Sequence, residues 1–162
     1  MSFRSIDIDA FDEERLSEKE IFEFSHSGGG EGIEQQSPEA VFASVQVKEV
    51  EARSLLQKGN AANALTIAID NPPYGLDRDN AKELNAKIVM DVLNSVKTTD
   101  IPLIVKSLSS EQQDTLMKYI YRGMATPESS SSSAILLNWH EKLTEIAGVG
   151  CIVRVITDRK TV

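Results

Sequence analysis

Residues that start or stop helices recur at short intervals from Ser37 onward, and this punctuation limits the folds that the chain can adopt. Ser37-Pro38 is typical of a helix start, because serine caps the first turn and proline suits its φ. Gly59 is typical of a helix end, and Asn71-Pro72-Pro73 cannot continue a helix. Apolar residues at helical spacing fill the intervals. We therefore predict six or seven short helices, with candidate ranges 38–58, 61–70, 80–97 (capped by Asp79), 101–108, 111–124, 133–147 and 149–160.

The final segment, VGCIVRVITDRK (149–160), is the ambiguous one. Its β-branched residues favour a strand. Helical spacing is nevertheless kept by Val149, Ile152, Val153 and Ile156, so we predict a helix. The segment EARSLLQKGNAANALTIAIDNPP (51–73) has the small-residue turn and terminal proline of a tetratricopeptide-like helical pair, but no 34-residue period recurs along the chain. The prediction is an all-α body, an irregular α-α superhelix of antiparallel helical hairpins.

The N-terminal segment carries nearly all of the net charge. Residues 1–37 hold ten acidic and three basic side chains, which gives −7 of the chain's formal −8. Four of the chain's five phenylalanines also lie here, whereas a purely solvating segment has few aromatics. We predict an extended acidic docking arm at 1–24 that orders on a partner, a flexible glycine-rich linker at 25–37 and a helical body at 38–162. The alternative is a disordered terminus whose apolar residues bind nothing.

Charge and composition also bear on the class of protein and its compartment. Nucleic acid would repel the acidic arm, and the nearly neutral body has no broad basic face, so nucleic-acid binding is not expected. A single cysteine, Cys151, allows no internal disulfide, which fits a reducing compartment. The N-terminus lacks the pattern of a signal peptide, and no apolar run approaches the length of about 20 residues that a membrane span needs. We expect a soluble intracellular protein.

The sequence offers no complete set of catalytic or metal-binding residues. A hydrolytic triad needs a nucleophile, a base and an orienting acid together. Because His26 lies in the linker, the body supplies only His140. A metal site usually needs three or four ligands at recognisable spacing, and the body has neither HxxxH nor CxxC. Gly148 and Gly150 are too few for a phosphate-binding loop. We therefore predict no enzyme activity, no metal and no cofactor.

The stretch SAILLNWHEKL (133–143) holds the only tryptophan. In helical register Trp139 lies on an apolar stripe with leucines, and His140 borders that stripe. Such a histidine is usually hydrogen-bonded in a core or an interface, and catalysis is the less favoured alternative. A tryptophan in this place is also a common binding anchor. Tyr119 and Tyr121 are interpreted as packing residues of the preceding helix.

Five ordered blocks of the sequence resemble one known family. They are FRSIDIDAFDE (3–13), LLQKGNAANALTIAIDNPP (55–73), LMKYIYRG (116–123), LLNWHEKL (136–143) and GVGCIVRVITDRKTV (148–162). Together they span nearly the whole chain and look like subunit 5 of the actin-related protein 2/3 complex, the assembly that nucleates branched actin filaments. The resemblance implies a non-catalytic structural subunit in the cytoplasm and the actin cytoskeleton.

The same resemblance implies partners for each part of the chain. The helical body would pack on the core of the complex, against subunit 4 and the β-propeller subunit 1, and the arm would hold an actin-related protein. Carried over by residue, the arm's apolar anchors and charged partners would be Phe3, Ile6, Ile8, Phe11, Asp7, Asp9 and Asp12. The alternative is an unrelated intracellular helical adaptor whose acidic arm binds another partner.

On the body, the blocks around Trp139 and Val153 are predicted to be core or interface. The sequence does not separate these two, because both need an apolar stripe. Arg154, Arg159 and Lys160 cluster near the C-terminus and either pair with an acidic neighbour or compensate a helix C-terminus as solvated charges.

Overall fold

The computed structural model describes residues 37–75, 78–125 and 133–162. Over these ranges the secondary structure is entirely helical, which confirms the predicted all-α class. None of these helices is long and apolar enough to cross a membrane. The helices are α2 (Pro38–Gln57), α3 (Ala61–Ile69), α4 (Asp79–Ser95), α5 (Ile101–Ser107), α6 (Ser110–Ala125), α7 (Ser133–Ala147) and α8 (Val149–Thr157).

The helix boundaries follow the punctuation of the sequence. Ser37 Oγ accepts a hydrogen bond from the amide of Ala40 at 3.3 Å and so caps α2. At its other end Gly59 has φ +75°, and its amide bonds to Leu56, while the next amide bonds to Leu55. This pair of bonds is the Schellman arrangement, which satisfies the last carbonyls of a helix. A polar cap and a glycine turn therefore explain where α2 begins and ends.

Several predicted boundaries differ from the observed ones in detail, and the clearest differences are at α4 and α8. Asp79 was expected to cap α4, but Arg78 occupies the cap position without a side-chain cap bond, and Asp79 is the first helical residue. An acidic side chain also suits the first turn, because it faces the positive end of the helix dipole. α8 ends at Thr157 rather than near residue 160.

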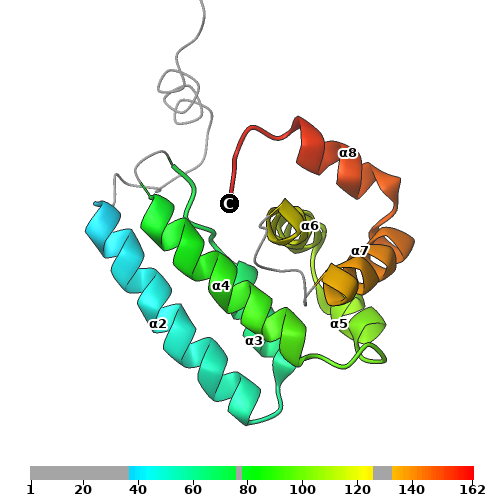
Figure 1. The fold of residues 1–162 in the computed structure, drawn as a ribbon, viewed down its shortest axis with the longest axis horizontal. Helices are drawn as coiled ribbons and strands as arrows, with labels where there is room; N and C mark the ends of the chain where they lie inside the picture. The colour runs from blue at the N-terminus through cyan, green and yellow to red at the C-terminus, as the bar shows by residue number, and fades with distance from the viewer. Residues whose placement is uncertain (1–36, 76–77, 126–132) are drawn as a thin grey trace, which may run out of the picture. The chain divides into compact units, whose positions relative to one another are not determined.

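The helices pack as two groups that meet at α6. Helices α2, α3 and α4 contact one another, and α5 contacts α7. α6 packs against α7 and α8 on one side and against α3 and α4 on the other. Figure 1 views α6 nearly along its axis, with α7 and α8 curving around it and α2 and α4 running side by side. The body is thus an irregular superhelix with α6 at its centre.

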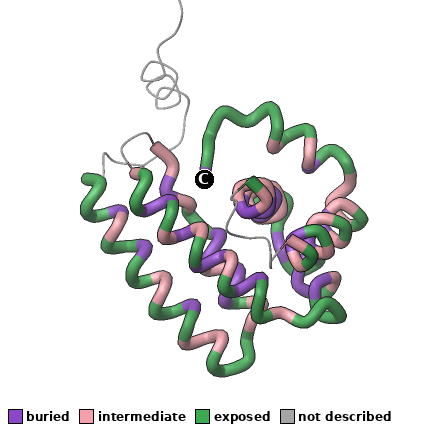
Figure 2. Tube along the Cα trace, viewed as in Figure 1, coloured by how far each residue is buried: buried purple, intermediate pink, exposed green. Residues whose placement is uncertain are grey.

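The core lies where the two groups meet. Figure 2 shows buried positions along α6 and on the inner faces of α4 and α7, whereas α8 is mostly exposed. The largest fully buried side chains are Trp139, Tyr119, Leu65, Ile69, Leu93, Ile101, Leu116, Met117, Ile120, Leu136, Leu143 and Val45. Gly123 of α6 sits so close to α4 that an added Cβ would lie 2.8 Å from Cε of Met90. The absence of a side chain at Gly123 therefore leaves room for the side chains of Met90 and Leu136 against α6.

Candidate functional site

The apolar stripe of α7 belongs to the core. Trp139 is fully buried, together with Leu136 and Leu143. Its indole nitrogen donates a hydrogen bond of 3.3 Å to the carbonyl oxygen of Leu93, which lies in the last turn of α4. A buried tryptophan usually needs such a partner. The side chain therefore joins α7 to α4 and is not on a surface that a partner could reach.

His140 and Tyr121 form a pair at the edge of this core. The tyrosine hydroxyl lies 3.1 Å from Nε2 of His140, and the ring centres are 5.6 Å apart. Both side chains are half-buried. This geometry fits the predicted hydrogen-bonded packing histidine. In the part of the chain that the structure describes, no group of three or more His, Cys, Asp or Glu side chains is placed to hold a metal ion.

Tyr119 lies inside the body between α4 and α6. The side-chain amide of Asn85 donates to its hydroxyl and also to the carbonyl oxygen of Ala68 at 3.1 Å. Burial raises the pKa of the Tyr119 phenol well above its ordinary value, although the bond from Asn85 acts in the opposite direction. The phenol is therefore neutral in the folded protein at neutral pH, and Asn85, which bonds to both Tyr119 and Ala68, links α3, α4 and α6. This placement fits the interpretation of Tyr119 as a packing residue.

The stripe of α8, in contrast, faces outward. Val149, Val153 and Ile156 are 67%, 55% and 73% exposed, which makes this the largest group of exposed aliphatic side chains on any one of the described helices. Val153 is therefore not part of this chain's core. The opposite side of α8 carries Cys151, which is fully buried and whose thiol lies 3.8 Å from the carbonyl oxygen of Gln113. We refer to Val149, Val153 and Ile156 as the α8 face.

The basic residues near the C-terminus have different surroundings. Arg154 makes two bonds to the carboxylate of Asp114, at 2.6 and 2.8 Å. The acidic partner of Arg154 thus lies in the same chain. Burial of Asp114 acts to raise the pKa of its carboxyl group, but the bonds from Arg154 and Cys151 and the nearby charges outweigh this, so the pKa is lowered. Arg159 is exposed.

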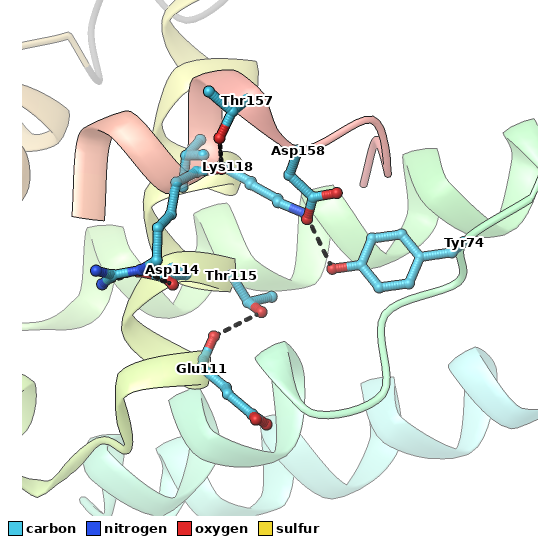
Figure 3. A pocket seen from close by; sticks show the side chains of 9 residues that line it. Tyr74, Glu111, Asp114, Thr115, Lys118, Thr157 and Asp158 are labelled. Atoms are coloured by element: carbon cyan, nitrogen blue, oxygen red, sulfur yellow. Dashed lines mark hydrogen bonds and ion pairs between the residues drawn. The ribbon is translucent and has the colours of Figure 1, made fainter. Parts of the chain in front are cut away.

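A pocket of about 340 Å³ lies between α6 and α8, with the loop before α4 at its edge. Figure 3 shows Lys118 between Asp158 and Tyr74. Asp114, also labelled there, accepts its bonds from Arg154. Lys118 and Asp158 are 2.6 Å apart. Two ion pairs, Lys118 with Asp158 and Arg154 with Asp114, thus cross the pocket and join α6 to α8. Sequence patterns did not predict this pocket, because its paired residues lie 40 positions apart in the chain.

The remaining predictions lie outside the described residues. They concern the docking arm, with its anchors and charged partners from Phe3 to Asp12, the linker as far as residue 36, and the loop at 126–132.

Comparison with known proteins places the chain in one family. The family model of the ARP2/3 complex 16 kDa subunit (p16-Arc) matches residues 2–162. Actin-related protein 2/3 complex subunit 5-C of Xenopus laevis is 41% identical over 160 residues, covering 99% of this chain and 94% of that protein. Subunit 5 of Saccharomyces cerevisiae is 34% identical, covering 99% and 97%, and the human subunit 5-like protein is 36% identical, covering 99% and 94%. The chain therefore belongs to the family of the 16 kDa subunit (p16-Arc) of the ARP2/3 complex.

Proposed function

We propose that this chain is a non-catalytic structural subunit of the actin-related protein 2/3 complex and that it supports nucleation of branched actin filaments. The observation that carries the proposal is the family match along residues 2–162, together with relatives that are 34% and 41% identical over 99% of this chain. The body supports it as well, because His140 packs against Tyr121 and the two pocket cations, Lys118 and Arg154, pair with carboxylates of the same chain. The protein would act in the cytoplasm, in the actin cytoskeleton, without a cofactor.

The α8 face is our candidate for the surface that packs on the core of the complex. Exposed aliphatic side chains grouped on one face of a helix commonly mark protein interfaces. Val153 is at the centre of this face. We propose that the β-propeller subunit 1 or subunit 4 covers it. Trp139 is no longer a candidate contact, because it is fully buried within the chain.

The arm is our candidate for the element that tethers an actin-related protein. The apolar residues Phe3, Ile6, Ile8 and Phe11 would be its anchors, and Asp7, Asp9 and Asp12 its charged contacts. A 13-residue linker at 25–37 would span at most about 45 Å when extended. A tether of this length raises the effective concentration of the partner while it permits the partner to rotate.

The first test is purification of the complex through a tag on an actin-related protein of the same organism, with the co-purifying chains identified and counted. A tag on this chain's C-terminus is unsuitable, because Val162 is 7% exposed and its carbonyl oxygen is bound by Arg122. We expect this chain at equal stoichiometry with the other subunits. Its absence from the complex, or its recovery with an unrelated set of partners, would favour the helical adaptor instead.

Deletion of residues 1–24 tests the arm separately. We expect the truncated chain to stay with the core subunits, while the actin-related protein is retained less well and branching activity falls. The matched control replaces the same residues with an uncharged glycine-serine segment of equal length, which keeps the length but removes the anchors. Unchanged retention and branching in the deletion variant would refute the tether.

A further inference from the structure

The five residues after α8, 158–162, run back across α6, and we call them the strap. The ammonium group of Lys118 in α6 donates to the carboxylate of Asp158 at 2.6 Å and to the carbonyl oxygen of Lys160 at 2.9 Å. It also lies 3.4 Å from the hydroxyl of Tyr74, in the loop before α4 (Figure 3). The Lys118 side chain is only 9% exposed. A cation that is buried to this extent needs partners, and the strap supplies two of them.

The far end of the strap is held as well. Arg122 of α6 donates to the carbonyl oxygen of Val162, and Lys82 of α4 donates to the hydroxyl of Thr161 at 3.2 Å. The Val162 side chain is buried in the core. In Figure 1 the end of the chain accordingly lies beside α6 and α4 rather than near α8. Three basic side chains from two helices thus hold a segment of five residues.

α8 needs such anchors because it is short and mostly exposed. It has nine residues, and an isolated helix of this length is marginal in water. Among the described helices it contacts α6 and α7, and its contacts with α6 include buried Cys151 and the pair of Arg154 with Asp114. Its outer side is the exposed α8 face. Without the strap, only its inner side would hold it in place.

We propose that the strap acts as a latch, held chiefly by the bonds of Lys118. Release of the strap lets residues 149–162 open as one unit while α2 to α7 remain folded. The latch stabilises α8 from its C-terminal end and so fixes the position of the α8 face. Its contacts connect the last helix to the loop before α4, to α4 and to α6, across 40 or more residues of sequence. The inference rests on these contacts and is independent of the proposed subunit role.

Hydrogen exchange followed by mass spectrometry on the full chain tests the latch. Lys118→Met removes the ammonium group that holds the strap. Asp158→Asn removes the charge of its carboxylate partner and leaves the buried side chains in place. Arg53→Met is the matched control, because it removes a cation from an exposed pair with Glu49 within α2. We expect amides of 149–157 to exchange roughly ten- to a hundredfold faster in both latch variants, as for the loss of a hydrogen bond to a charged group. Amides of α2 and α3 should change less than about twofold.

Each possible result of this experiment either supports or refutes the latch. Faster exchange confined to α8 and the strap supports the latch. Equal acceleration in all helices would mean that the strap is one more part of a single cooperative core, and unchanged exchange would mean that Lys118 does not hold it; both refute the latch. If Lys118→Met does not fold, Asp158→Asn alone answers the question.

Discussion

Two neighbouring helices, α7 and α8, carry apolar stripes of similar appearance and put them to opposite uses. The stripe of α7 is buried, and Trp139 at its centre bonds to a carbonyl of α4. The stripe of α8 is exposed at Val149, Val153 and Ile156, while a small thiol, Cys151, lies on the buried side. An apolar stripe therefore identifies a surface that needs a neighbour, and only the packing shows whether that neighbour belongs to the same chain.

The largest expected effect of a substitution lies in the α7 stripe. Trp139→Ala should reduce the free energy of unfolding by about 3–5 kcal/mol, because it leaves a cavity between α7 and α4 and removes the bond to Leu93. Urea denaturation followed by far-ultraviolet circular dichroism would measure it. The control is Leu137→Ala, which truncates a 58% exposed side chain of the same helix and should cost no more than about 0.5 kcal/mol. Equal costs for the two variants would contradict the core assignment of Trp139.

The helices themselves were predictable because their signals are local. Ser37 and Gly59 act on the backbone within one turn of where they stand, and their geometry is the expected one. The partner of Arg154 was not predictable, because Asp114 lies 40 residues away and nothing in the sequence links the two. The orientation of Val153 was not predictable either, since periodicity gives the direction of a stripe relative to its own helix and not relative to the fold.

Lowering the pH should weaken α8 before α7, and we expect this effect to be of intermediate size. The strap and α8 are held by two carboxylates, Asp158 and Asp114. Burial acts to raise the pKa of Asp158, but its bonds from Lys118 and from the amide of Lys160, with the charges of both lysines, outweigh this and lower the pKa. The pKa of Asp114 is lowered as well, with Arg154 as its closest cation.

A carboxyl group whose pKa is lower in the folded state contributes stability above its unfolded pKa, about 3.9 for aspartate, and that contribution is lost as the pH falls through the folded pKa. Exchange protection of α8 should thus be constant from neutral pH to about pH 5 and fall below about pH 4, before the core around Trp139 opens. Nuclear magnetic resonance of backbone amides during an acid titration would resolve the two helices. In Asp158→Asn, the share of α8 exchange protection that the strap contributes should no longer depend on pH. Simultaneous loss of α7 and α8 signals in the native chain would contradict the separation.

The smallest effect on stability is expected at the α8 face, where the effect on assembly should be large. Val153→Asp replaces a side chain that is 55% exposed, and valine and aspartate have similar helix propensities. The free energy of unfolding should therefore change by no more than about 0.5 kcal/mol. A partner covering this face would have to bury an unpaired carboxylate, which is costly. Incorporation of the variant into the purified complex, measured in competition with the native chain, should therefore fall at least about tenfold. Leu103→Asp on α5, at a 76% exposed leucine, is the matched control. Normal incorporation of Val153→Asp, or equal loss in both variants, would mean that the α8 face is not the specific surface by which the body joins its neighbours.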